Sequence, residues 1–224
     1  MVVMPDEQNV LYPTQAMEFR DEVFGHFARM GAAFGHARRL QLIMVLSQGE
    51  RSVETLANEV GSTVANTSRH LRILAGAGLV TRRADGTSRI YRLSSPAVAE
   101  AYYTLIKLAE KHIADVSSLA DAFFDEIDGT TPISLEELAE ISREGNVLLV
   151  DVRPPQEYAH GHLDGAINLP VGEIAGRLAE LPPDSKVVAY CRGPYCVMSA
   201  TAVHQLREAG YDAVRLAEAF TPTG

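Results

Sequence analysis

The ten residues from Val187 to Cys196 constrain the fold of this 224-residue chain more than any other segment. An apolar run of β type ends at Cys191, a short loop follows, and a helical pattern begins near Val197. The segment therefore predicts a strand, a tight loop and a helix, with a cysteine placed where the strand ends. The unpaired N–H groups and the dipole of a helix N-terminus favour the thiolate, which is the nucleophilic form of cysteine.

Cys191 and Cys196 are the only two cysteines of the chain, and Arg192 adds a positive charge beside the first. Two cysteines five positions apart are not a disulfide framework. They fit a reducing cytoplasm, where a cysteine pair is more often catalytic, sensing or metal-binding. The alternative interpretation is a pair of small buried residues without a chemical role.

Two further motifs precede this loop. Residues 147–153 form a buried-strand pattern that ends in charge, and residues 157–170 have the sequence EYAHGHLDGAINLP. With the cysteine loop, these motifs closely resemble a rhodanese domain, from about Thr131 to the end of the chain. The resemblance implies an α/β domain with a parallel sheet and a persulfide on Cys191, the first cysteine of the loop.

The same resemblance implies roles for the neighbours of Cys191. Backbone N–H groups of the loop would cradle the outer sulfur, and supporting residues would hold the loop in place. The resemblance implies catalytic roles for Cys191, Asp151 and Arg153. The charge of Arg192 and the second thiol, Cys196, which stands where the family commonly has Ser or Thr, add these two residues to the predicted catalytic set. The predicted cradle residues are Gly193, Tyr195 and Cys196. Two features depart from the family pattern: Pro194 has no N–H to donate, and residues 214–220 lack the usual Gly-Gly pair and tryptophan.

The net charge of −9 would by itself argue against nucleic-acid binding, but the charges are unevenly distributed. Residues 18–95 contain eleven arginines against seven acidic residues, whereas residues 96–224 contain nine basic residues against twenty acidic ones. This asymmetry indicates that the first segment meets a polyanion and the second does not. Arginine also suits phosphate groups and base edges better than lysine does.

No apolar run approaches the roughly 18 residues that span a bilayer. The N-terminal residues show no basic region leading into an apolar stretch, so we expect no secretory signal and a cytoplasmic location.

Two helical patterns separated by a tight turn lie within the basic segment. Ser52 is expected to cap a helix over residues 53–60, and residues 61–63 turn into a second helix. In that helix an apolar stripe is predicted to face the core: Val64, Thr67, Leu71 and Leu74. The opposite face centres on Arg69 and also contains Ala65, Asn66 and Arg72, a pattern suited to the major groove of DNA. The alternative is an ordinary exposed helix face.

A basic hairpin follows, because Asp85-Gly86 separates two alternating runs. It contains Arg82, Arg83, Arg89 and Arg92. A helix-turn-helix followed by such a hairpin is a winged helix-turn-helix, and residues 67–80 closely resemble the ArsR family of dimeric bacterial repressors, with a likeness from about Phe27 to Leu93. The resemblance implies a set of DNA-contacting residues: Thr63, Ala65, Asn66, Ser68, Arg69, His70, Arg72, Arg82, Arg83 and Arg89.

Members of that family often sense metals through cysteines on the helix before the recognition helix. Residues 51–57 contain no cysteine, and His112 and Asp115 lack a second pair of ligands beside them. We therefore expect no metal site and no cofactor.

Ser95-Pro96 predicts a helix start, and apolar residues recur from there to Ile127, predicting one helix of roughly eight turns. So long a stripe is expected to pack against the same helix and the N-terminal helix of a second subunit. Ser134 and Glu137 form a predicted capping box that opens the second domain. The expected organisation is a tail (1–17), a winged helix-turn-helix with dimerisation helices (18–127), a linker (128–133) and a rhodanese-like domain (134–224).

Three functions fit this organisation. The first is a repressor whose regulatory input is sulfur chemistry at Cys191. The second is a thiosulfate-type sulfurtransferase fused to a DNA-binding domain. The third is a repressor with a catalytically idle second domain, against which the intact cysteine loop argues.

Cys196 favours the first function. A second thiol within reach of a persulfide could release sulfide or close a bridge, which a switch needs and an enzyme does not. A variant of this hypothesis has the two thiolates capture a thiophilic ion such as arsenite. The expected partners are a double-stranded DNA operator with an inverted repeat, a second copy of the chain and a small sulfane-sulfur donor. No membrane partner is expected.

Overall fold

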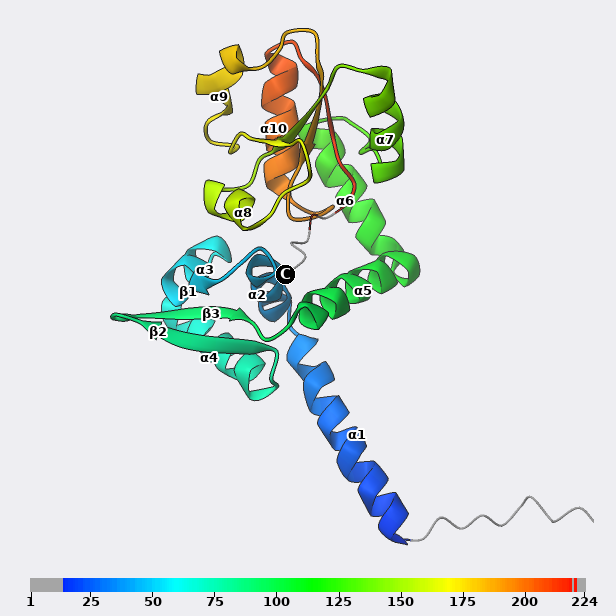
Figure 1. Cartoon of the computed structure of the whole chain (residues 1–224). Helices are drawn as coiled ribbons and strands as arrows, with labels where there is room; N and C mark the ends of the chain where they lie inside the picture. Colours follow the sequence, from blue (N-terminus) through cyan, green and yellow to red (C-terminus); the bar gives the residue numbers. More distant parts are fainter. Residues whose placement is uncertain (1–13, 219, 221–224) are drawn as a thin grey trace, which may run out of the picture.

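The computed structural model describes residues 14–218 and 220. A mostly helical winged helix-turn-helix domain comes first and an α/β domain second, as the sequence predicts, and helix α1 projects away from both (Figure 1). The expected N-terminal tail lies largely outside the described residues, since α1 already begins at Thr14. Within the described residues, no helix is long and apolar enough to cross a membrane.

Up to Leu93, the first domain consists of four helices and a small antiparallel sheet in the order β1-β3-β2. The elements are α1 (Thr14–Phe34), α2 (Ala37–Leu46), β1 (Arg51–Ser52), α3 (Val53–Glu59), α4 (Val64–Gly76), β2 (Val80–Asp85) and β3 (Ser88–Leu93). The predicted cap at Ser52 is present, because its Oγ accepts from the N–H of Thr55 at 3.1 Å, and Thr63, in the predicted turn, also caps α4, with its Oγ1 accepting from the N–H of Asn66 at 3.3 Å. Each cap satisfies an N–H group that a helix start leaves unpaired.

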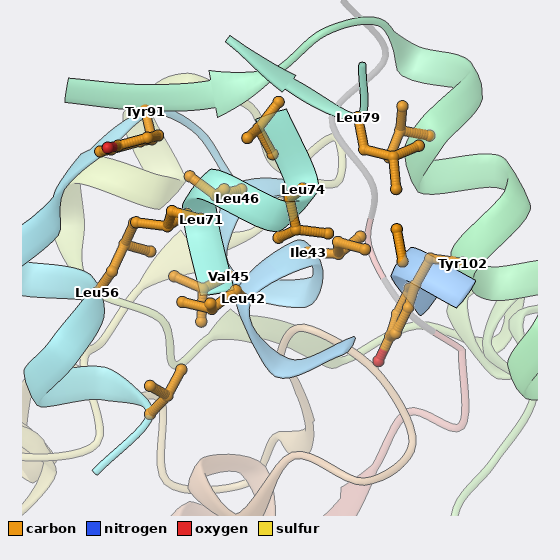
Figure 2. Packing of buried hydrophobic residues seen from close by; sticks show 14 of the residues in the cluster. Leu42, Ile43, Val45, Leu46, Leu56, Leu71, Leu74, Leu79, Tyr91 and Tyr102 are labelled. Atoms are coloured by element: carbon orange, nitrogen blue, oxygen red, sulfur yellow. The ribbon is translucent and has the colours of Figure 1, made fainter. Parts of the chain in front are cut away.

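The core of this domain lies between α2, α3 and α4 (Figure 2). Leu42, Leu56, Leu71 and Leu74 are fully buried there. Thr67 is buried as the predicted stripe requires, but Val64 is 44% exposed, so its assignment to the core was wrong. It stands at the first position of α4, where the helix has only just emerged from the turn.

The segment between the two domains also differs from the prediction, which was a single long helix from Ser95 to Ile127. In place of one long helix, α5 (Pro96–His112) and α6 (Ala114–Ile127) meet at Ile113, whose backbone is extended (φ −119°, ψ 95°). The break redirects α6 toward the second domain, where it contacts α10 (Val197–Glu208) (Figure 1). Part of the apolar stripe is therefore covered within the chain, and buried Asp128 and Arg215 form an ion pair at its end.

The second domain is built on a parallel four-stranded sheet in the order β5-β4-β6-β7, with helices on both faces. Besides α10, its elements are α7 (Leu135–Glu144), β4 (Val147–Asp151), α8 (Pro155–His160), β5 (Ile167–Asn168), α9 (Ile174–Arg177), η1 (Leu178–Glu180), β6 (Lys186–Tyr190) and β7 (Asp212–Arg215). The predicted capping box of Ser134 and Glu137 is present at the start of α7. Central β6 is buried along most of its length, so the loop that follows it starts from a rigid position.

Candidate functional site

The cysteine loop lies at the carboxyl end of β6 and leads into α10, as predicted. Cys191 is only 2% exposed, and a disulfide joins it to Cys196 across Cα atoms 6.2 Å apart. That spacing lies within the ordinary range for a disulfide. The structure therefore holds the loop in its bridged form, in which neither sulfur is a free thiolate.

The backbone of the cysteine loop forms a tight turn. Gly193 adopts φ 151°, which favours glycine, and the N–H of Cys196 donates to the carbonyl of Gly193 at 3.1 Å. Of the three predicted cradle residues, Cys196 thus has its N–H engaged within the loop. Tyr195 is exposed, and its hydroxyl donates to Glu110 of α5 at 2.8 Å. Pro194 supplies no N–H.

Arg192 is buried and bound to a buried carboxylate. Its Nε and Nη2 donate to Oε2 and Oε1 of Glu157 at 3.1 and 2.5 Å, and Glu157, in the first turn of α8, is 0% exposed. Burial opposes the charge of Arg192, but hydrogen bonds and the charges of Glu157 and Glu59 prevail and raise its pKa. This arginine is therefore a fixed part of the protein interior.

Two residues of the first domain also bind to the Arg192–Glu157 ion pair. Glu59 Oε2 lies 2.6 Å from Arg192 Nη2, and Arg51 Nη2 donates to Glu157 Oε1 at 3.0 Å. Arg51 Nε also lies 3.7 Å from Glu59 Oε1. We name Arg51, Glu59, Glu157 and Arg192 the interdomain ion network. Each arginine contacts both glutamates, so the four charges alternate and cancel across the domain boundary.

The network touches the first domain at two elements next to its predicted DNA-binding surface. Arg51 lies in β1, which pairs with wing strand β3 in the register Arg51 to Tyr91. Glu59 is the last residue of α3, which packs against α4. Arg192 is therefore linked, through Arg51 and Glu59, to one element that pairs with β3 and to another that packs against α4.

Asp151 and Arg153 form a second buried cluster beside the loop. Arg153 Nε donates to Asp151 Oδ1 at 2.9 Å, and its Nη1 donates to Oε1 of Gln48, a fully buried residue of the first domain, at 2.6 Å. Gln48 Nε2 donates to the carbonyl of Phe220 at 3.2 Å, and the Phe220 ring lies 4.8 Å from the Arg153 guanidinium. The pair thus contributes to the contact between the domains, and it lies close to the loop through the neighbouring Tyr190 ring and through Gln48, whose Nε2 donates to the hydroxyl of Tyr103 at 3.4 Å.

Tyr103 of α5 links the first domain to the loop backbone. Its hydroxyl donates to the carbonyl of Arg192 at 3.2 Å and lies 3.3 Å from Ser47 Oγ. With the Tyr195–Glu110 hydrogen bond, this gives α5 two contacts with the cysteine loop.

The predicted DNA-facing residues lie mainly on one exposed face of α4. Those at or near the surface are Thr63, Ala65, Asn66, Ser68, Arg69 and Arg72. His70 does not belong to this face, because it is buried and its ring centroid lies 4.4 Å from that of His36. Burial, together with the charges of His36 and nearby arginines, lowers the pKa of His70.

The wing arginines Arg82, Arg83 and Arg89 are all exposed. Arg83 is paired with Glu50 and, at 3.2 Å, with Asp85. Among the described residues, no group of three or more His, Cys, Asp or Glu side chains could hold a metal ion.

Comparisons with known proteins place both domains. Residues 36–82 match the family described as bacterial regulatory protein, arsR family, and residues 134–220 match the rhodanese-like domain. The chain is 44% identical over 190 residues to the HTH-type transcriptional regulator Rv0324 of Mycobacterium tuberculosis, a match that covers 84% of this chain and 83% of that protein. The chain belongs to the ArsR family of bacterial transcriptional regulators.

Two further proteins are each similar to a single domain of this ArsR-family regulator. A sulfurtransferase of Allochromatium vinosum is 42% identical over 69 residues, which is 31% of this chain and 63% of that protein. The solution structure of the homodimeric winged helix-turn-helix DNA-binding domain Mb0332 of Mycobacterium bovis is 30% identical, with a TM-score of 0.40. It covers 50% of this chain and 94% of that chain. The two family matches show that the regulator joins an ArsR-type domain to a rhodanese-like domain.

Sequence reasoning missed the residues through which the two domains of the regulator meet. They are Gln48, Arg51, Glu59, Tyr103, Glu110 and Glu157. Glu157 lies within the motif that indicated the rhodanese-like domain, but nothing local marks it as a buried partner of two arginines. No residue pattern within one domain could reveal the five others, since their partners lie in the second domain.

Replacing Glu157 with alanine should strongly destabilise the regulator. Arg51 and Arg192 would remain buried without the carboxylate that they share, and breaking such a buried pair costs about 3–5 kcal/mol. Urea denaturation followed by circular dichroism measures this loss of unfolding free energy. The control is Gln156→Ala at the exposed neighbouring position, expected to change stability by less than about 0.5 kcal/mol. Equal stability of the two variants would contradict the importance of the network.

Proposed function

We propose that this regulator binds operator DNA as a homodimer and that sulfane-sulfur chemistry at Cys191 and Cys196 controls its DNA affinity. One observation supports this proposal above the others. Arg192 follows Cys191 directly and is bound both to Glu157 of its own domain and to Glu59 of the DNA-binding domain. Chemistry at the cysteine pair therefore acts on a residue that spans the two domains.

On the DNA side, the exposed residues of α4 would read base edges in the major groove and the wing arginines would contact phosphates. The proposed contacts are Thr63, Ala65, Asn66, Ser68, Arg69 and Arg72 from α4 and Arg82, Arg83 and Arg89 from the wing. His70 is left out because it is buried against His36.

The N-terminal helix supports the proposed homodimer. Large apolar residues of α1 are exposed on the single chain: Met17, Phe19, Phe24, Phe27 and Met30. Several large apolar side chains exposed on one helix favour an interaction site, and a second copy would cover them with the two-fold symmetry that an inverted-repeat operator requires. We therefore expect α1 to lie at the interface between the two copies.

The proposed chemistry starts from the reduced pair. The Cys191 thiolate attacks the sulfane sulfur of a donor, the donor leaves with its bonding electrons, and Cys191 becomes a persulfide. The Cys196 thiol, losing its proton, then attacks Cys191 Sγ and expels hydrosulfide, which closes the disulfide. Overall, two thiols are oxidised and one sulfane sulfur is reduced. In the cytoplasm, where we place the regulator, disulfides are usually transient and catalytic or sensing.

Coupling to DNA would use the interdomain ion network. The bridge closes a loop from Cys191 to Cys196 that contains Arg192, so opening the bridge changes the constraint on that arginine. Since Glu59 and Arg51 lie next to the recognition helix and the wing, the two redox states would differ in operator affinity. Such couplings amount to about 1–3 kcal/mol, or about 5- to 150-fold.

A sulfurtransferase enzyme is the second candidate. The placement of Cys191 between β6 and the N-terminus of α10 and the likeness to a sulfurtransferase support it. The enzyme would deliver sulfur from Cys191 to an external acceptor such as cyanide, with operator affinity unchanged by the reaction.

The first test concerns DNA reading. Arg69→Ala should lose about 1–3 kcal/mol of discrimination between operator and unrelated DNA, because a base contact disappears. Arg82→Ala should weaken binding to all sequences alike and reduce the salt dependence by about one counterion. Fluorescence anisotropy at several salt concentrations measures both effects. An Arg69→Ala variant that retains full discrimination would show that this face does not read DNA.

The second test separates the two cysteines. Cys191→Ser should abolish sulfur uptake from a sulfane donor. Cys196→Ser should still form the Cys191 persulfide but lose most of the change in DNA affinity, because no bridge can close. Mass spectrometry and operator binding are measured on the same samples. A Cys196→Ser variant that switches like the wild type would exclude the bridge as the signal.

The third test concerns coupling. Glu59→Gln removes a charge that faces Arg192 while leaving the cysteines intact, so the bridge should form at the wild-type rate but alter operator affinity far less. The matched control is Glu54→Gln, at an exposed position of the same helix. If Glu59→Gln responds as fully as the control, the signal does not pass through the network.

A further inference from the structure

The two cysteines of the Cys191–Cys196 bridge differ in exposure. Cys191 is 2% exposed and belongs to the hydrophobic core that β6 and α10 share. Cys196 is only partly buried at the edge of that core, and its chain neighbours Tyr195 and Val197 are 38% and 47% exposed. One end of the bridge is therefore enclosed by the protein, and the other lies near the surface.

A nucleophile opens a disulfide by direct attack on one of the two sulfurs. It approaches roughly along the S–S axis, from the side opposite the sulfur that leaves, so access to the attacked sulfur helps to set the rate. An approach to Cys191 would pass through packed side chains and requires the loop to open first. Cys196 already has surface open to solvent in the closed loop.

Cys196 also occupies the N-cap position of α10. This helix has twelve residues, and the cap residue has an extended backbone (φ −86°, ψ 110°) and no side-chain hydrogen bond to the helix. The unpaired N–H groups at a helix start favour negative charge on a nearby sulfur. While a thiolate attacks, negative charge is shared among three sulfurs, and α10 would stabilise the part of it on Cys196.

The leaving group acts in the opposite direction. Attack on Cys196 expels Cys191 as a thiolate, and burial among apolar groups makes a thiolate a poorer leaving group. Arg192 offers little compensation, because its guanidinium is bound to Glu157 and Glu59. Access decides the outcome, since a sulfur that can be reached reacts slowly with a poor leaving group, whereas a sulfur without exposed surface does not react until the loop opens.

From the exposure and the helix position together, we infer that Cys196 is a thiolation site: a low-molecular-weight thiol opens the bridge at Cys196 and stays attached there as a mixed disulfide. This inference concerns the bridged form, whichever oxidant closed the bridge, and so goes beyond the sulfane-sulfur switch.

Both steps of the opening balance in atoms and electrons. The thiolate R–S⁻ forms a bond to Cys196 Sγ, and the bond between the two protein sulfurs breaks with its electron pair going to Cys191. A second R–S⁻ then attacks the sulfur attached to Cys196, which forms R–S–S–R and releases the Cys196 thiolate. Two thiols are oxidised, and the protein disulfide accepts the two electrons.

The mixed disulfide gives the regulator a third state. Cys191 is then a free thiol beside Arg192, whereas Cys196 is blocked and cannot attack a persulfide. Under the proposed function, the thiolated regulator would accept sulfur on Cys191 without closing the bridge until the attached thiol is removed. Such thiolation is reversible.

The test uses the bridged full-length protein with two probes, glutathione and sulfite. Glutathione leaves a mixed disulfide on the attacked sulfur, and sulfite leaves a stable S-sulfonate there while it expels the other cysteine as a thiolate. An acid quench protonates that thiolate and stops its return attack. After N-ethylmaleimide has blocked the free thiols, trypsin cleaves behind Arg192 and separates the two cysteines into peptides 187–192 and 193–207, which mass spectrometry compares.

At the shortest reaction times, the label on Cys196 should exceed that on Cys191 by at least about tenfold, which corresponds to a loop-opening cost of about 1.4 kcal/mol. The matched control is the same protein unfolded in urea. Both sulfurs are accessible there, so the label should be shared far more evenly.

The outcomes distinguish this inference from the proposed function. Label found mainly on Cys191, or shared alike in the folded and unfolded protein, would overturn the thiolation site and leave the switch intact. A bridge that neither probe opens in the folded protein would also overturn it, because Cys196 would then be inaccessible. Operator affinity that stays unchanged after the bridge is fully opened would instead contradict the proposed function, with thiolation of Cys196 unaffected.

Discussion

The shared burial of Glu157 between Arg51 and Arg192 is the interaction on which the rest of this structure depends. A carboxylate with no exposed surface needs cationic partners, because an isolated buried charge is very unfavourable. One partner comes from each domain, so the pairing is complete only when the domains are docked. The arginine that follows Cys191 is thereby fixed in relation to the winged helix-turn-helix domain, with Glu59 as a second contact.

Arginines have two separate roles in this molecule. Those on α4 and the wing are exposed and give the acidic chain a local positive surface. Those around the cysteine loop are buried and paired with carboxylates. The net charge of −9 is therefore compatible with DNA binding, whereas the arginines around the cysteine loop are each paired with carboxylates. The electrostatic difference between the two domains is thus set by burial as much as by composition.

Much of this architecture could be predicted because its signals are local. The strand before Cys191, the cap at Ser52 and the capping box at Ser134 each depend on residues a few positions apart. The break of the long helix at Ile113 was missed, because the apolar repeat continues through it and only packing on α10 decides the direction. Burial of His70 against His36 and of Glu157 against Arg51 likewise depends on residues that are distant in the sequence.

The most direct test of the account is amide hydrogen exchange on the full-length protein, with the Cys191–Cys196 pair reduced and then bridged. If Arg192 transmits the redox state through Glu59 and Arg51, exchange should change in residues 51–59 and in wing strand β3, far from the cysteines in sequence. A change confined to the cysteine loop and α10 would contradict the account, because the two domains would then sense the chemistry independently.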